Sequence, residues 1–180
     1  TIQFSLREAL NNPLSDANPI LAARDTVHIF PSESARALAS LTARLESQSR
    51  RLEPAKLVTV VGNVEYQGVY PLSDGMDISG LIKASYDIKE YTDLDYALLK
   101  RENILENKTD FEVISLKEPD DLSLKLKSRD KLYVFNLNQG RESLLSDLIA
   151  EIEAQTSKEN ERKLVTINGQ VRFPGTYPLA

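Results

Sequence analysis

The sequence predicts an α+β protein built from a repeated unit, on two observations. The first is an internal repeat, because residues 56–72, KLVTVVGNVEYQGVYPL, return as residues 163–179, KLVTINGQVRFPGTYPL. Self-similarity over a long period is typical of modular arrays. The second is the order of elements that the pattern predicts from the first copy onward: two strands, a short helix and three strands. A small sheet with one helix across it is an α+β layer arrangement.

The repeated segment predicts a β-hairpin. Two runs rich in β-branched and apolar residues lie on either side of Gly62, as in paired strands. In the second copy Pro174-Gly175 stands at the turn, and this dipeptide is typical of a type II turn because Pro fixes φ and Gly accepts a positive φ. We expect the same turn at Gly68 in the first copy. We expect Gly62 and Gly169 to be backbone devices, a bulge or a bend, and not ligand contacts.

The rest of the unit contains a short helix and three strands. Residues 77–86 carry apolar side chains at helical spacing behind Asp77, a suitable N-cap. Residues 96–101 and 111–116 have strand patterns. Residues 130–135 are apolar on both faces, so we expect this last strand to lie in the centre of the sheet or to be well covered.

Two amphipathic helices are expected between the units. Residues 32–51 and 139–154 each place apolar side chains along one face and charged side chains over much of the rest. We expect these stripes to be buried within the chain, with the helices acting as spacers between modules. Burial against a neighbouring protomer is the alternative.

The repeat also divides the chain into segments. Residues 24–30, RDTVHIF, match residues 129–135, RDKLYVF, which aligns the last strands of two units. The predicted segments are the C-terminal part of a preceding module at 1–31, a helical connector at 32–55, a complete module at 56–137, a second helical connector at 138–162 and the opening hairpin of a further module at 163–180. An incomplete module exposes strand edges, so we expect the last hairpin to pair with residues 1–31 of the same or another molecule, or to fray.

Composition excludes several classes of function. The chain of 180 residues has a net charge of −5 and no cysteine. An acidic balance disfavours nucleic acid and anionic lipid as partners, and the lack of Cys removes thiol chemistry and cysteine-based metal sites. His28 is the only histidine, and Tyr133 stands at the matching position of the second unit, so we expect a structural role for it. We therefore expect no metal, no cofactor and no catalytic residues, and the chain is predicted not to be an enzyme.

Two recurring Arg-Asp pairs have a structural interpretation. Arg24-Asp25 and Arg129-Asp130 each stand just before the last strand of their unit. A turn in which the Asp side chain accepts backbone amides explains both pairs without a partner. Ion pairs between subunits are the alternative.

Tyrosines are the candidate ligand contacts. An aromatic face is apolar while the hydroxyl can form hydrogen bonds, which suits stacking on sugars. Tyr70 and Tyr177 recur in the repeat, so we expect them to be packing positions. Tyr86 and Tyr91 lie in the loop after the short helix, and they are the candidate ligand-binding residues.

These elements resemble the SLBB module, the soluble ligand-binding β-grasp. The resemblance rests on the pattern V-T-V-x-G-x-V-x-x-x-G-x-Y-P-L, on residues 77–84 (DISGLIKA), on residues 96–101 and on residues 122–134 with their Arg129-Asp130 pair. It implies β-grasp modules joined by amphipathic helices. The sequence departs from the family after the helix, where residues 84–87, ASYD, replace a Gly-rich stretch.

Arrays of this module with intervening helices resemble the periplasmic part of Wza-like outer-membrane polysaccharide export proteins of Gram-negative bacteria. The resemblance implies a non-enzymatic periplasmic module of a capsular or extracellular polysaccharide export protein, which contributes to oligomeric assembly and to passage or binding of polysaccharide. The implied partners are polysaccharide, further copies of the chain through stacked modules, and an inner-membrane polysaccharide co-polymerase. A monomeric carbohydrate-binding or small-ligand-binding β-grasp module is the alternative.

Overall fold

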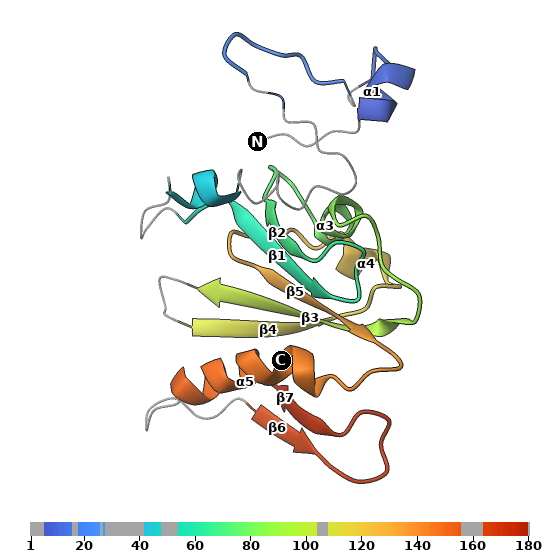
Figure 1. The fold of residues 1–180 in the computed structure, drawn as a ribbon, viewed down its shortest axis with the longest axis vertical. Coiled ribbons are helices and arrows are strands. Elements are labelled where there is room, and N and C mark those ends of the chain that lie inside the picture. The colour runs from blue at the N-terminus through green and yellow to red at the C-terminus, as the bar shows by residue number, and fades with distance from the viewer. Residues whose placement is uncertain are drawn as a thin grey trace.

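The chain combines helices with a mixed β-sheet and is therefore α+β, as the sequence predicts (Figure 1). The structure, a computed structural model, describes residues 6–15, 18–25, 27, 42–47, 54–103, 108–155 and 164–179. Its helices are α1 (Leu6–Asn11), α3 (Ile78–Ala84), α4 (Pro119–Leu122) and α5 (Glu142–Gln155), and residues 42–47 are also helical. Its strands are β1 (Leu57–Gly62), β2 (Gly68–Pro71), β3 (Thr92–Asn103), β4 (Lys108–Ile114), β5 (Lys131–Asn136), β6 (Leu164–Ile167) and β7 (Gly175–Pro178).

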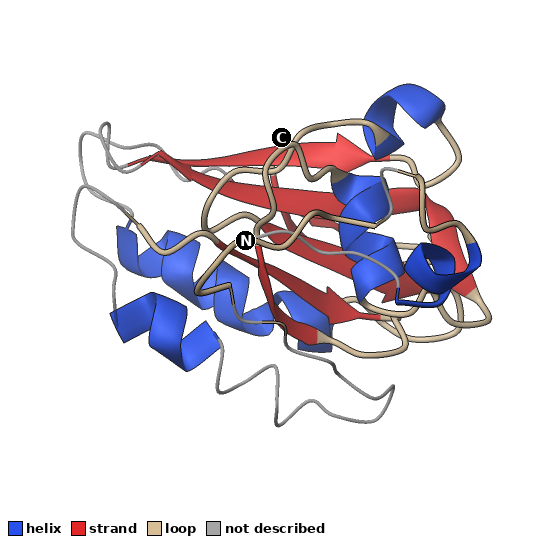
Figure 2. Cartoon of the chain, turned by 90° about the horizontal axis from the view of Figure 1, so that it is seen from above, coloured by secondary structure: helices blue, strands red, loops and turns tan. Residues whose placement is uncertain are grey.

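Five strands form one sheet in the order β2-β1-β5-β3-β4. Strands β1 and β5 are parallel, and the other neighbours are antiparallel. The central position of β5 confirms the expectation drawn from its apolar pattern, because its residues Leu132, Tyr133, Val134 and Phe135 are all buried. Seen from above, helical segments lie around the strands (Figure 2).

Strand β3 is longer than the predicted 96–101, because it pairs with β4 on one edge and with β5 on the other. Its first residue, Thr92, pairs with Asn136, and the register shifts before Ala97. The predicted strand at 111–116 instead begins at Lys108 and ends at Ile114. The strand ends there because Ser115 turns its amide toward the Asp121 carboxylate, 2.7 Å away.

Helix α3 packs on one face of the sheet. Asp77 is its N-cap, as predicted, since its Oδ1 accepts a hydrogen bond of 2.9 Å from the Gly80 amide. The helix is shorter than the predicted 77–86 and ends at Ala84. The side chains that fill this face come from α3, β1, β3 and β5, and they include Ile78, Leu81, Ile82, Val58, Val60, Ala97, Leu99, Leu132 and Val134.

Helix α5 covers the opposite face (Figure 1). Leu145 and Leu148 are buried against Leu98, Tyr133 and Phe135 of the sheet. The apolar stripe of this helix is thus intramolecular core, as expected. The helix starts at Glu142 and not at residue 139, because a turn precedes it. Of the first predicted helix, 32–51, only residues 42–47 are described, and the rest lies outside the described residues.

Strands β6 and β7 form a separate hairpin beneath α5 (Figure 1). Its register is that of the β1–β2 hairpin, since Val165 pairs with Tyr177 as Val58 pairs with Tyr70. The two paired tyrosines also form the same hydrogen bond. The hydroxyl of Tyr70 donates to the carbonyl four residues earlier at 2.5 Å, and that of Tyr177 does so at 2.9 Å.

The turn glycines of both hairpins have positive φ, at 156° for Gly68 and 148° for Gly175. These values lie far above the roughly +80° of a type II turn, so the predicted turn type is wrong although the need for glycine is right. Gly62 and Gly169 share a φ of 101°. At Gly62 a Cβ atom would lie 2.0 Å from the Val134 carbonyl oxygen, so close strand packing as well as conformation requires glycine there.

Candidate functional site

The loop that follows α3 holds both candidate tyrosines and is bound to the β1–β2 turn. We call residues 85–92 the tyrosine loop. The amide of Tyr66 donates to the Ser85 carbonyl at 3.0 Å, and the amide of Glu65 donates to the Asp87 carbonyl at 3.0 Å. Farther along, Lys89 donates to the Asn63 carbonyl at 3.1 Å. These backbone hydrogen bonds attach the loop to the sheet.

Helix α3 ends in a Schellman motif with a tyrosine where glycine is usual. The Asp87 amide donates to the Ile82 carbonyl at 3.0 Å, and the Tyr86 amide donates to the Lys83 carbonyl at 3.1 Å. This pattern places Tyr86 at the C′ position, which glycine favours because the backbone there is left-handed. Tyr86 has a φ of 63° and Asp87 a φ of 84°. The missing Gly-rich stretch therefore marks the positions where side chains are held in a strained conformation.

Such strain carries a cost. A non-glycine residue in the left-handed region costs on the order of 1–3 kcal/mol, and residues of this kind cluster at functional sites. Tyr91 is a third example in the same loop, with a φ of 60°. The hydrogen bonds to the β1–β2 turn stabilise this conformation.

The Tyr86 ring is exposed and oriented by a second tyrosine. It is 53% exposed, and it meets the half-buried ring of Tyr66 edge to face, with centroids 5.3 Å apart and an interplanar angle of 87°. Tyr66 was not selected as a candidate ligand contact, although it directly precedes Gln67-Gly68 in the turn. Burial, and secondarily the nearby Tyr86, raise the pKa of Tyr70 to about 12. Tyr70 is thus a neutral packing residue beneath this pair, as predicted.

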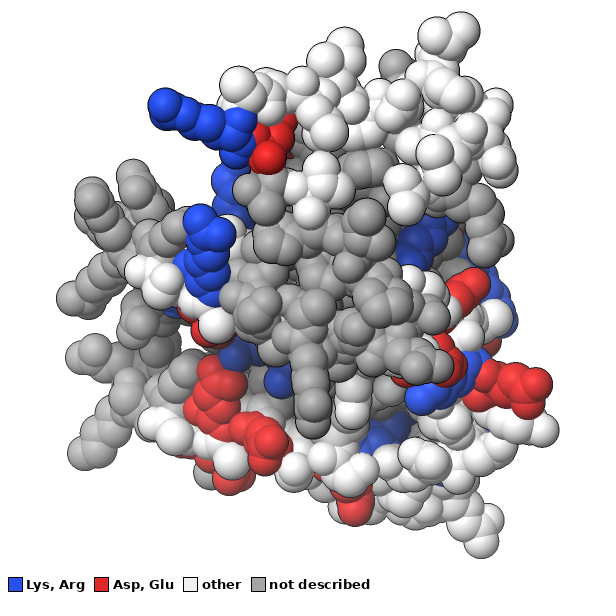
Figure 3. All heavy atoms as spheres, turned by 45° about the horizontal axis from the view of Figure 1, so that its top comes forward, with Lys and Arg blue, Asp and Glu red and all other residues white. Residues whose placement is uncertain are grey.

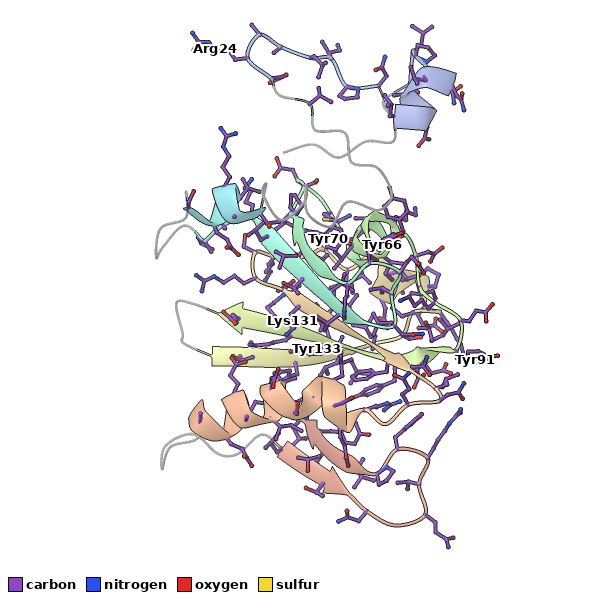
Figure 4. All side chains as sticks on the ribbon, viewed as in Figure 1. Arg24, Tyr66, Tyr70, Tyr91, Lys131 and Tyr133 are labelled. Atoms are coloured by element: carbon purple, nitrogen blue, oxygen red, sulfur yellow. The ribbon has the colours of Figure 1, made fainter. Side chains whose placement is uncertain are left out.

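Tyr91 lies apart from this pair. Its ring is 64% exposed, and its carbonyl accepts a hydrogen bond of 2.7 Å from the Leu137 amide. Figure 4 shows it at the edge of the molecule, well separated from Tyr66 and Tyr70. The structure therefore does not bring the two candidate residues together into one site.

Two hollows lie elsewhere on the described surface. One, of about 320 Å³, lies between the β5–α5 turn and the β6–β7 turn and is lined by Leu137, Asn138, Gln139, Gly140, Glu142, Arg172, Phe173 and Pro174. The other, of about 400 Å³, lies over β1, β3 and β5 and contains the cations Lys100, Arg129 and Lys131. Its charges are largely paired, because Lys100 lies 2.7 Å from Glu151 and 3.2 Å from Glu102. Basic and acidic side chains are also intermixed on the face in Figure 3.

The Arg-Asp pairs form the predicted turn. The Asp130 carboxylate accepts the Lys127 amide at 2.8 Å, and the Asp25 carboxylate accepts the Ala22 amide at 2.7 Å. Sequence reasoning missed Arg101, whose guanidinium binds the buried Asp130 with contacts of 2.7 and 3.1 Å. This hydrogen-bonded ion pair raises the pKa of Arg101.

Two further properties of the described residues concern metal ions and membranes. Among the described ranges, no group of three or more His, Cys, Asp or Glu side chains is placed to hold a metal ion. Within the same residues, no helix has the length and apolar character needed to span a membrane. His28 lies outside the described residues.

Comparison with protein families gives a match to the segment that precedes the tyrosine loop. Residues 57–85 match the model of the SLBB domain family. The match covers β1, β2 and α3 and ends at the first residue of the tyrosine loop. Comparison with curated proteins gave no match. The chain is thus an α+β protein in which residues 57–85 are similar to the SLBB domain family.

Proposed function

We propose that the chain is a non-enzymatic SLBB module of a capsular or extracellular polysaccharide export protein, with β-grasp topology, and that the tyrosine loop contacts the polysaccharide. The β-grasp assignment is supported by the strand order β2-β1-β5-β3-β4, with parallel β1 and β5 at its centre and α3 packed across one face. The family match at residues 57–85 supports the SLBB assignment.

The observation that carries the site is the exposed Tyr86 ring at a position that favours glycine. A bulky residue there costs stability that glycine would not, and ligand contact is the benefit that we propose for it. A ring held by Tyr66 in one orientation offers a sugar an apolar face at a low entropic cost. Asp87, Lys89 and Glu90 follow in the same loop and supply polar groups for hydroxyls.

A titration with matched variants tests this site. Amide resonances of the labelled chain are followed while a neutral gluco-oligosaccharide or an oligo-uronide is added. We expect shifts confined to residues 63–67 and 85–90, and their loss in Tyr86→Gly, which removes the ring but keeps the left-handed backbone. Tyr91→Gly is the matched control, because its backbone is also left-handed. Unshifted resonances, or loss of binding only in Tyr91→Gly, would contradict the proposal.

The proposed setting is the periplasm, as part of an outer-membrane-associated protein of a Gram-negative bacterium. The proposed partners are polysaccharide, further copies of the chain through stacked modules, and an inner-membrane polysaccharide co-polymerase. These proposals rest on the resemblance of the sequence to export proteins. Cell fractionation of the tagged protein checks the compartment, and recovery in the cytoplasm alone would contradict it.

A further inference from the structure

The side chain of Asn63 forms a hydrogen-bond network with the tyrosine loop and with β5. Its Nδ2 atom donates to the Glu90 carbonyl at 3.0 Å and to the Thr92 hydroxyl at 2.7 Å. Its Oδ1 atom accepts a hydrogen bond of 3.1 Å from Nδ2 of Asn136. Because an amide nitrogen carries two hydrogens, Asn63 uses both of its side-chain donors on the loop.

The orientation of this amide follows from its partners. The Glu90 carbonyl can only accept, so the nitrogen of the Asn63 side chain must face it. Asn136 is fixed in the same way, because its Oδ1 accepts the Asn138 amide at 2.7 Å and leaves its nitrogen for Asn63. Neither a carboxylate nor an apolar side chain at position 63 could donate to the loop.

The backbone of Asn63 also connects the loop to the sheet. Its amide donates to the carbonyl of the buried Val134 at 2.8 Å, and its carbonyl accepts the Lys89 amide at 3.1 Å. Thr92 is buried as well, and its hydroxyl donates to the Lys89 carbonyl at 2.7 Å. Loop residues 89, 90 and 92 are therefore attached to the core of the sheet through Asn63.

The residue between these attachment points is Tyr91, whose backbone conformation needs support. Tyr91 has a φ of 60°, and a residue other than glycine is strained in this region. The two residues that the Asn63 side chain holds, Glu90 and Thr92, lie on either side of it. The first half of the loop is attached by backbone amides of the β1–β2 turn. Asn63 thus supplies the side-chain contacts that keep the second half folded.

We propose that Asn63 is the positioning residue of the tyrosine loop. It holds residues 89–92 next to the β1–β2 turn, so that the loop presents Tyr86 to a sugar without first having to become ordered. A loop that is ordered in advance loses little conformational entropy on binding, which raises affinity. This inference rests on the proposed function for the sugar contact, whereas the holding of the loop can be measured without a sugar.

Hydrogen exchange of two amides tests the holding of the loop. The Lys89 amide donates to the Asn63 carbonyl, and the Leu137 amide donates to the Tyr91 carbonyl at 2.7 Å. Asn63→Asp keeps the size of the side chain but removes both of its donors. We expect it to lower the exchange protection of these two amides roughly tenfold, as the net loss of one to two hydrogen bonds implies.

Two controls separate this role from a general effect on the fold. The Leu116 amide donates to the Leu94 carbonyl outside the loop at 2.8 Å, and we expect it to keep its protection in Asn63→Asp. Asn138→Asp adds the same charge at an exposed side chain, and we expect it to leave all three amides unchanged. The proposal is overturned if the two loop amides keep their protection in Asn63→Asp, or if Leu116 loses as much as they do.

A sugar titration then tests the positioning. Thr92→Val is the second variant, because it removes the hydroxyl that receives the Asn63 amide and keeps the shape of the side chain. We expect both variants to bind an oligosaccharide roughly two- to fivefold more weakly than the original chain, since the competent loop is less populated. Unchanged affinity with deprotected loop amides would overturn the positioning role. If the original chain binds no oligosaccharide, the proposed function fails, and the exchange data still decide whether Asn63 holds the loop.

Discussion

The guanidinium of Arg141 lies 4.1 Å from the ring centroid of Tyr96, and it forms a buried ion pair with Asp93. The guanidinium also lies 4.3 Å from the ring centroid of Phe173 in the second hairpin. Tyr96 also meets Tyr177 edge to face, with centroids 6.3 Å apart. Arg141, directly before α5, thus contacts both the sheet and the second hairpin.

Replacing Arg141 is expected to loosen this link. Arg141→Ala leaves the Asp93 carboxylate buried and unpaired, which costs about 3–5 kcal/mol. Arg141→Lys keeps the charge but loses the planar stacking surface, so we expect an intermediate loss. Urea unfolding measures the free energies, and the amide resonances of residues 164–179 report whether the hairpin stays attached. A lysine variant as stable as the original chain would show that stacking on the rings contributes nothing.

The two hairpin glycines offer a matched pair of substitutions. Gly62 and Gly169 have the same φ, but a Cβ atom meets the Val134 carbonyl at Gly62 and nothing within 4 Å at Gly169. We expect Gly169→Ala to cost about 1 kcal/mol from backbone strain alone. Gly62→Ala is expected to cost several kcal/mol more, because β1 and β5 must move apart. Thermal unfolding of both variants checks this, and equal losses would contradict a role for the close strand contact.

The left-handed backbone that holds the Tyr86 ring exposed is expected to lower the stability of the fold. Tyr86→Gly is expected to stabilise the chain by about 1 kcal/mol, because glycine relieves the left-handed strain at the end of α3. Tyr86→Ala also removes the ring but keeps the strain, so it should not stabilise. Chemical denaturation compares the two variants. A destabilised glycine variant would mean that the Tyr66 contact outweighs the backbone cost.

Buried tyrosines should make the fold sensitive to alkali. Burial raises the pKa of Tyr70 and of Tyr133 to about 12 in the folded chain, from 10.0 when exposed. Their contribution to stability is therefore complete below pH 10 and is lost as the pH rises from 10 toward 12. We expect the stability of Tyr70→Phe to fall less between pH 10 and pH 12 than that of the original chain. Tyrosinate absorbance measures the ionisation, and chemical unfolding at each pH measures the stability. The same pH dependence of stability in Tyr70→Phe and in the original chain would contradict the raised pKa of Tyr70.

Several features follow from short stretches of sequence. The Asp77 cap, the need for glycine at the hairpin turns and the Arg-Asp turns are all set by hydrogen bonds or sterics within a few residues. The apolar pattern of β5 also predicted its central position. In contrast, the Arg101–Asp130 pair joins residues 29 positions apart, and no local pattern marks such a partner.

The candidate site was likewise predictable from the sequence only in part. Loop position and residue type were enough to select Tyr86 and Tyr91 as candidate ligand contacts, and both rings are exposed. They did not reveal that Tyr86 sits in the left-handed position after α3, that Tyr66 orients its ring, or that Tyr91 lies elsewhere. Those facts depend on how the β1–β2 turn docks on the loop.

The amino-acid sequence alone determined the repeated hairpin, the α+β class and the tyrosines worth testing, because period, capping and turn chemistry are local. Only the tertiary structure decided which strands are neighbours and which aromatic rings stay in water. These properties depend on contacts between segments far apart in the chain, where packing and backbone pairing override local preference.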